Sequence, residues 1–155
     1  MSIHTEYALG QSTTIIDGFF NLTYVRNYGA AFGFLSTINA NFREIFFLVM
    51  PPAALIIIIM ILRGVDEDDK PQLFALSCVF GGAIGNYIDR LRFRYVIDFL
   101  DFHYGQYRWP AFNIADSAIV CGVSILLLLM FLHRNHVEEK PTGESEKTNE
   151  PAPVT

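Results

Sequence analysis

Charged side chains are scarce in this chain of 155 residues, at 17% of the total, whereas a soluble domain carries about a quarter. Three stretches contain none at all: residues 45–62, residues 71–88 and residues 117–132. Each approaches the roughly 20 residues that a helix needs to cross a hydrocarbon layer of about 30 Å. Three such runs in so short a chain exclude a solenoid, a coiled coil, a disordered protein and a disulfide-stapled secreted domain. They predict a small polytopic membrane protein.

Cysteine and clustered basic residues are scarce as well. Cys78 and Cys121 both fall inside apolar runs and lack the spacing of zinc or redox motifs. The net charge of −5 arises largely from an acidic turn at residues 66–69 and an acidic C-terminal tail, and no basic stripe typical of nucleic-acid binding is present. We therefore expect no nucleic-acid partner.

The apolar runs differ in their composition. The first contains Pro51 and Pro52, which should kink the helix or end one helical segment. The second carries Gly81 and Gly85 at the four-residue spacing that lets membrane helices approach closely, so we expect it in the middle of the bundle. Before them, residues 15–25 have the pattern of a strand or short hairpin.

Polar residues cluster at the ends of the second and third runs, where ionisable side chains mark functional sites by default. Asn86, Asp89 and Arg90 share one helical face at the end of the second run. Asn113 and Asp116 share a face at the start of the third. The segment between these helices adds two further aspartates, so several carboxylates are expected near one membrane face.

Two carboxylates brought close together cannot both ionise cheaply, so they share a proton and can activate water against an amide carbonyl. Chemistry alone leaves open which two act. The alternative is that Asp89 and Arg90 form an interfacial ion pair and Asp116 only caps a helix. A transporter with a carboxylate relay is a further alternative, whereas one histidine beside two carboxylates is a poor zinc signature. The candidates for the pair are Asp89, Asp98, Asp101 and Asp116.

Four blocks, in this order and spacing, resemble the signature blocks of bacterial lipoprotein signal peptidase, also called signal peptidase II. The resemblance covers roughly residues 8–132. It implies a membrane aspartic endopeptidase that cleaves prolipoproteins on the amino side of a diacylglyceryl-modified cysteine, with no metal or organic cofactor. The blocks are residues 19–33, 81–90, 95–99 and 112–117.

The resemblance also selects the catalytic pair and its surroundings. The family's catalytic aspartates correspond to Asp98 and Asp116, and isoleucine replaces a family valine at position 97. Five further polar positions match those that the family places around the pair, for substrate binding or site support. They are Asn27, Asn86, Asp89, Arg90 and Asn113.

The fold that the resemblance implies is an all-α polytopic membrane bundle with a small extracytoplasmic β-cradle and a short interfacial helix. The family has four transmembrane helices, and this sequence resembles it from a point after the first, so three are expected here. We expect a polar N-terminal segment at 1–14, the cradle and interfacial helix at 15–44, the bundle with a catalytic loop at 45–133, and a disordered acidic tail at 134–155.

The expected location is the bacterial inner membrane, with several membrane passes and the active site near the extracytoplasmic face. The expected partners are diacylglyceryl-modified prolipoproteins and membrane lipids, and the chain is expected to be a monomer. The arginines at positions 90, 92 and 94 are expected to contact lipid phosphates. A noncatalytic lipoprotein- or lipid-binding relative is the alternative function.

Overall fold

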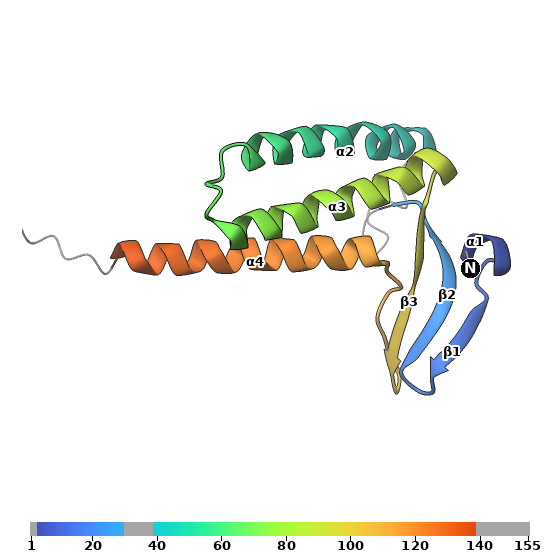
Figure 1. The fold of residues 1–155 in the computed structure, drawn as a ribbon. Coiled ribbons are helices and arrows are strands. Elements are labelled where there is room, and N and C mark those ends of the chain that lie inside the picture. The colour runs from blue at the N-terminus through green and yellow to red at the C-terminus, as the bar shows by residue number, and fades with distance from the viewer. Residues whose placement is uncertain (1–2, 30–38, 139–155) are drawn as a thin grey trace, which may run out of the picture.

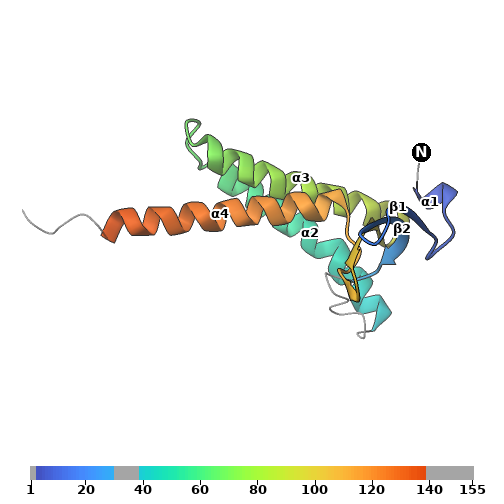
Figure 2. The same ribbon diagram turned by 90° about the horizontal axis from the view of Figure 1, so that it is seen from below.

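The computed structural model describes residues 3–29 and 39–138. Three long helices lie side by side, and a small sheet stands at one end of them (Figure 1). The helices are α2 (Ala40–Leu62), α3 (Lys70–Phe93) and α4 (Ile114–Glu138). Helix α3 contacts both of the others, and in Figure 2 it runs beside α4 while α2 is inclined to it. The expected central position of the second helix is confirmed.

The sheet is antiparallel with strand order β1-β2-β3-β4. Strands β1 (Ser12–Ile16) and β2 (Phe20–Asn27) form the predicted hairpin, and the short helix α1 (Ile3–Glu6) precedes them. Gly18 adopts a φ of +70° in the hairpin turn, a conformation that glycine reaches without strain. The sheet therefore begins inside the segment that was expected to be only a polar extension.

The sequence predicted a loop between α3 and α4, and this prediction is wrong. The connection forms β3 (Val96–Tyr104) and β4 (Tyr107–Arg108), and β3 pairs with β2 along most of its length. Strand β2, the partner of β3, lies 69 to 82 residues earlier in the chain, so no local sequence pattern reveals the pairing. The all-α description is thus incomplete, because the cradle takes two of its four strands from inside the helical region.

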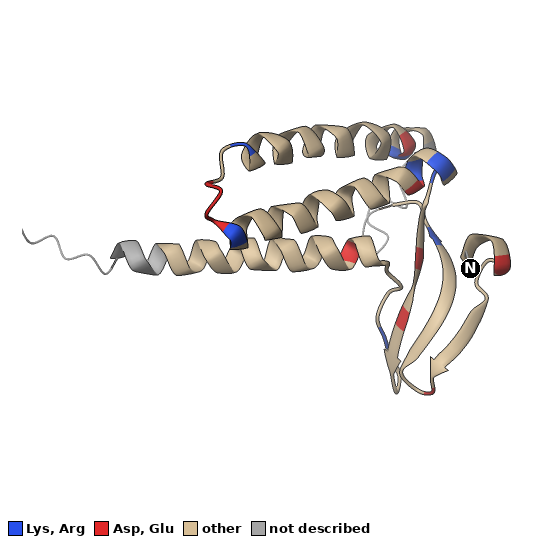
Figure 3. Ribbon diagram, viewed as in Figure 1, with Lys and Arg blue, Asp and Glu red and all other residues tan. Residues whose placement is uncertain are grey.

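Two helices in the described part of the chain are long and apolar enough to cross a membrane, at residues Asn41–Leu62 and Ile114–His133. Figure 3 shows charged residues gathered at the two ends of the helices, with an almost uncharged band between. A helix of 23 residues is about 35 Å long, which matches a hydrocarbon core of about 30 Å. Large apolar side chains on α2 and α4 point outward, as lipid-facing surfaces require.

Both ends of the bundle differ in detail from the expectation. Helix α2 continues through Pro51 and Pro52 as one element, so the prolines do not end it. Helix α4 runs to Glu138, past the expected start of the tail at residue 134. Most of the segment expected to form an interfacial helix (30–38), together with residues 139–155 of the tail, lies outside the described residues.

Helices α3 and α4 touch through glycines. A Cβ at Gly82 would overlap the carbonyl oxygen of Ala115, and one at Gly122 would lie 2.5 Å from the carbonyl oxygen of Ala75. Gly81 faces open space, whereas a Cβ at Gly85 would lie 3.2 Å from Ala115 Cβ. Helix α3 therefore approaches α4 through Gly82 and the predicted Gly85, but not through Gly81. This contact holds α3 against the first turn of α4, where the candidate site lies.

Candidate active site

Polar side chains occupy the most buried positions where the helices meet the sheet. Asp98 on β3 and Asn113, immediately before α4, are 2% and 4% exposed. Asp98 and Asp116, on the first turn of α4, both line one cavity of about 430 Å³. Burying polar groups is costly unless they are hydrogen-bonded, so the partners of these residues define the site.

Asn113 and Asp116 form a reciprocal cap at the start of α4. The Asp116 amide donates to Asn113 Oδ1 at 3.0 Å, and the Asn113 amide donates to Asp116 Oδ2 at 3.2 Å. This arrangement is a capping box with aspartate in the place of glutamate, and it satisfies two backbone donors that a helix start leaves unpaired. The alternative that Asp116 only caps a helix is therefore right about the cap, but the cap uses only one of its two carboxylate oxygens.

The second oxygen of Asp116 faces α3. Asn86 Nδ2 donates to Asp116 Oδ1 at 2.7 Å, and Asn86 Oδ1 in turn accepts from Asn113 Nδ2 at 3.1 Å. Because Asn86 is held at both ends of its amide, it cannot rotate without losing a hydrogen bond. The close glycine contact between the helices brings Asn86 within reach of Asp116.

Asp98 also has both carboxylate oxygens engaged. Asn113 Nδ2 donates to Oδ1 and Asn27 Nδ2 donates to Oδ2, each at 2.9 Å. The pKa of Asp98 is raised to about 6. Burial is the main cause and the negative charge of Asp116 adds to it, while the two amide hydrogen bonds partly oppose these effects. Asp98 therefore holds a proton to a higher pH than an exposed aspartate does.

Arg90 connects the edge of the sheet to α3. Its guanidinium donates to the carbonyl oxygens of Asn86 and Gly29, each at 3.2 Å, and lies 4.9 Å from the centre of the Phe47 ring. The Gly29 amide donates to Asn27 Oδ1 at 3.0 Å. Arg90 thus supports Asn27, which in turn positions Asp98, and its positive charge lowers the pKa of that aspartate.

Asp89 has a different role from its neighbour. Its Oδ2 accepts from the amide of Ile97 at 3.1 Å, which fixes the start of β3 against the end of α3. The turn between them uses Arg94 in the left-handed region, with a φ of +68°. Asp89 does not line the 430 Å³ cavity. Its contribution to the site is instead to hold the backbone next to Asp98.

Asp101, one of the four aspartates that chemistry alone left open for the catalytic pair, has other partners. It is 2% exposed, and Arg108 donates to both of its oxygens in a two-pronged ion pair. Asn21 Nδ2 also lies 3.4 Å from Asp101 Oδ2. The guanidinium hydrogen bonds hold the pKa of Asp101 below its usual range. Asp101 is therefore committed to an ion pair within the sheet and lies outside the cavity that Asp98 and Asp116 share.

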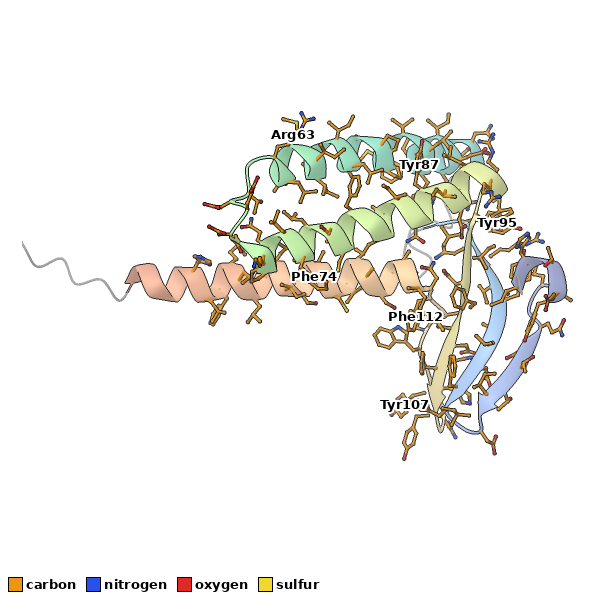
Figure 4. All side chains as sticks on the ribbon, in the orientation of Figure 1. Arg63, Phe74, Tyr87, Tyr95, Tyr107 and Phe112 are labelled. Carbon is orange, nitrogen blue, oxygen red and sulfur yellow. The ribbon has the colours of Figure 1, made fainter. Side chains whose placement is uncertain are left out.

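Sequence reasoning missed the apolar wall of the cavity. Trp109 belongs to none of the predicted site residues, yet it lines the cavity beside the proline and alanine that follow it. Val120 and Cys121, one turn further along α4 from the aspartate, line it as well. No motif marks these residues, and only the return of β3 and β4 towards α4 brings them together. In Figure 4, Phe112 lies where this return reaches the start of α4.

The described residues contain no group of three or more His, Cys, Asp or Glu side chains that could hold a metal ion. Within this part of the chain, the two cavity carboxylates are surrounded by amide and guanidinium donors. That donor set suits carboxylates that handle protons, since metal ligands need several converging anionic or imidazole groups.

Comparison with known proteins places this geometry in a family. The model of the family described as Signal peptidase (SPase) II matches residues 1–132. The chain is 43% identical to the lipoprotein signal peptidase of Maridesulfovibrio salexigens over 86% of both chains. It is 47% identical to that of Syntrophus aciditrophicus, over 83% of this chain and 80% of the other. A solved structure of a bacterial membrane enzyme matches with a TM-score of 0.77 at 32% identity, over 93% of this chain and 83% of that one.

Proposed function

This chain belongs to the signal peptidase II family, and from that premise we propose that it is a membrane aspartic endopeptidase that removes signal peptides from prolipoproteins. It cleaves before a diacylglyceryl-modified cysteine, and Asp98 and Asp116 are its catalytic pair. The single observation that carries this assignment is the shared cavity: two carboxylates from different elements line it, and Asn113 bonds to both.

The reaction requires one proton between the two carboxyl groups. We assign the shared proton to Asp98, whose pKa is raised to about 6, and the role of base to Asp116. Asp116 takes a proton from water as the water oxygen attacks the scissile carbonyl carbon, and Asp98 gives its proton to the carbonyl oxygen. When the tetrahedral intermediate collapses, Asp116 passes its proton to the leaving cysteine nitrogen, and a hydroxyl of the intermediate returns a proton to Asp98.

The remaining polar residues position the pair and do not exchange protons. Asn27 and Asn113 hold the two oxygens of Asp98, and Asn86 holds Asp116. This geometry is fixed before substrate arrives, so little reorganisation is needed when charge develops on the scissile carbonyl. Arg90 and Asp89 support the backbone segments that carry these residues.

The architecture suits a substrate that is half in the membrane. The cavity is lined by Asp98 of the sheet and by Val120 and Cys121 of the uncharged part of α4. In this proposal an extended peptide lies against the sheet while its acyl chains stay in lipid. In this proposal α2, α3 and α4 all cross the inner membrane, with the sheet and the active site at the extracytoplasmic face. Helix α3 crosses between the other two, which shield its more polar surface.

The test is cleavage of a diacylglyceryl-modified prolipoprotein by purified variants in lipid nanodiscs. Asp98→Asn and Asp116→Asn should each lower turnover by at least about 10³-fold while the protein stays folded, because each removes one proton-transfer partner. Asp17→Asn, at the exposed hairpin turn, is the control and should cleave normally. Normal turnover by either site variant would reject the assigned pair.

Asp101→Asn tests whether Asp101 has a structural role, as we propose, or belongs to the catalytic pair. It should lower the yield of folded protein, since Arg108 loses its partner, yet each folded molecule should cleave with little change. A loss as large as that of the site variants, measured per folded molecule, would instead place Asp101 in the catalytic pair. If no version of the chain, wild type included, cleaves but all bind the prolipoprotein, the noncatalytic alternative holds.

A further inference from the structure

Strand β2 carries one more residue than its partner in the part of the sheet next to the candidate site. From Leu22 to Val25 the strand advances three residues, while β3 advances two, from Leu100 to Asp98. This irregularity is a β-bulge, in which two residues of one strand stand opposite one residue of the other. The catalytic proposal gives the bulge no role.

The bulge decides which face of the sheet Asn27 occupies. Asn21 and Asn27 are six residues apart, so a regular strand would place both on one face. Asp98 and Asp101 are three apart on β3 and therefore face opposite sides. Yet Asn27 bonds to Asp98 at 2.9 Å, and Asn21 lies 3.4 Å from Asp101. If the register of Asn21 continued without the bulge, Asn27 would point away from Asp98, because a slip of one residue exchanges the two faces.

The bulge is held by the segment that precedes β1. The Tyr24 amide donates to the Gln11 carbonyl oxygen at 3.0 Å, and the Gly10 amide donates to the Tyr24 carbonyl oxygen at 2.9 Å. The Thr23 hydroxyl donates to the same Gln11 oxygen at 3.3 Å. Thr23 and Tyr24 are both buried, so backbone groups left unpaired there would be costly. Residues 10 and 11 therefore stabilise the bulge.

Gly10 gives this segment its shape. Its φ is +81°, in the left-handed region, and a Cβ there would meet nothing within 4 Å. A side chain at this position is therefore strained by the backbone conformation and not by crowding. Gln11 closes the turn, because its amide donates to the Ala8 carbonyl oxygen at 2.9 Å and its Oε1 accepts from the Ala8 amide at 2.8 Å.

We propose that Gly10 and Gln11 are positioning residues for cleavage, because their pairing with the bulge keeps Asn27 on the face of β2 that meets Asp98. Neither residue lines the cavity that Asp98 and Asp116 share, so they act on Asp98 through Asn27. This inference rests on the proposed function, in which Asp98 is catalytic, and adds to it an element from outside the site.

The matched variants are Gly10→Ala and Gly18→Ala, at opposite ends of the β1–β2 hairpin. Gly18 also has a positive φ, +70°, and open space around its Cβ position. Both substitutions strain the backbone in the same way, so both should lower the melting temperature by a similar amount. Gly18 lies in the hairpin turn, away from the bulge, and its variant is the control. Thr23→Val, which removes only the hydroxyl that donates to Gln11, is a milder second variant if Gly10→Ala does not fold.

The first measurement is the pH profile of kcat/KM for prolipoprotein cleavage. Gly10→Ala should lower kcat/KM by about 10-fold, because Asp98 is less well held. It should also move the apparent pKa assigned to Asp98 to a higher pH, since the Asn27 hydrogen bond lowers that pKa. Thr23→Val should shift the profile in the same direction by less, and the control should keep the wild-type profile. The charged groups near Asp98 are the same in all variants, namely Asp116 on α4 and Arg90 on α3.

Combining Gly10→Ala with Asn27→Ala tests whether the segment acts through Asn27. Asn27→Ala removes the bond to Asp98 directly, so the double variant should be no slower than Asn27→Ala alone.

The second measurement needs no substrate. The pH at which the melting temperature of wild type falls relative to Asp98→Asn reports the titration of Asp98. When both proteins also carry Gly10→Ala, this pH should be higher, because the folded Asp98 has lost a donor and keeps its proton longer.

Two results would overturn the proposal. If Gly10→Ala had the pH profile and the Asp98 titration of Gly18→Ala, the segment would only stabilise the sheet. If the double variant were slower than Asn27→Ala by the full Gly10→Ala factor, the segment would act without Asn27. Failure of the proposed function is distinguishable from both, since Asp98→Asn would then cleave normally while the substrate-free titration still shifted.

Discussion

The side-chain nitrogen of Asn113 lies 2.9 Å from Oδ1 of Asp98 and so joins the start of α4 to strand β3. The same residue caps α4 through its side-chain oxygen, which accepts from the Asp116 amide. One amide group therefore sets the positions of both carboxylates that we assign to catalysis. The nitrogen of that amide binds Asp98, and its oxygen caps α4.

Replacing Asn113 by alanine should affect both the rate and the pH dependence of cleavage. Misplacing the carboxylates should lower kcat/KM by about 100-fold. The Asn113 hydrogen bond lowers the pKa of Asp98, so its loss should move the apparent pKa assigned to Asp98 from about 6 to a higher pH. The kcat/KM profile between pH 4 and 9 measures this shift.

Asn39 provides the control for this substitution. Its side chain caps α2 by accepting from the Asn41 amide at 3.0 Å, far along the chain from the site. Asn39→Ala should lose a similar capping stabilisation of about 1 kcal/mol and leave the pH profile unchanged. If both alanine variants gave the wild-type profile, Asn113 would be only a helix cap.

Asp98 should make the folded protein less stable as the pH rises. Its pKa is about 6 in the folded state and near the ordinary 3.8 when unfolded, so between these values the folded state holds the extra proton. The favourable contribution is complete below pH 3.8 and is lost as the pH passes 6, by up to about 3 kcal/mol.

The comparison that isolates this effect is between wild type and Asp98→Asn, which cannot ionise. The melting temperature of wild type should fall relative to that of Asp98→Asn between pH 4 and pH 7.5, with both measured in the same detergent. A difference that stays constant over this range would mean that Asp98 is an ordinary, solvated carboxylate.

The sequence predicted those parts of the site whose residues lie close together along the chain, and missed those whose residues lie far apart. The cap formed by Asn113 and Asp116 spans three residues, so spacing alone placed them on one face. Asn86 was likewise placed at the correct end of the second helix. The contacts of Asp98 could not be predicted from pattern, because Asn27 lies 71 residues away and reaches it only through the pairing of β2 with β3.

The same limit explains the two corrections to the fold. Two aspartates interrupt the apolar alternation of residues 96–104, so the sequence pattern favours a loop over a strand there. Asp98 is satisfied from β2 and Asp101 from Arg108, which lets both sit inside a sheet. For the helix contact, spacing indicated Gly81 and Gly85. Gly85 does face α4, but its partner there is Gly82, since Gly81 is turned towards open space.

The contact at Gly82 gives a sharp test of how helix packing controls the site. Gly82→Ala places a Cβ on the carbonyl oxygen of Ala115 and 2.7 Å from Ile119 Cγ1, so α3 and α4 must separate. Asn86 lies one turn along α3 and should then lose its 2.7 Å hydrogen bond to Asp116. We expect a clear fall in melting temperature, of the size that 1–3 kcal/mol of overpacking produces, and about 10-fold or more lower kcat/KM.

Gly81→Ala is the neighbouring control. A Cβ at Gly81 meets nothing within 4 Å, and alanine favours a helix over glycine by about 1 kcal/mol, so this variant should be as stable as wild type or more so. Equal behaviour of the two alanine variants would mean that the helices are not in contact through Gly82.

The ion pair between Arg108 and Asp101 should stabilise the sheet without taking part in catalysis. Arg108→Gln leaves a buried carboxylate without its main donor, which should cost about 1–3 kcal/mol near neutral pH. Since the folded pKa of Asp101 is lowered, the stabilisation is present above the ordinary pKa near 4 and is lost as the pH falls through the folded value. The melting temperatures of wild type and Arg108→Gln should therefore differ at pH 6, and the difference should shrink as the pH falls below the ordinary value. Arg63→Gln, at the exposed far end of α2, should match wild type throughout. A gap that does not shrink as the pH falls would show that Arg108 acts through packing, because a protonated Asp101 no longer needs a cation.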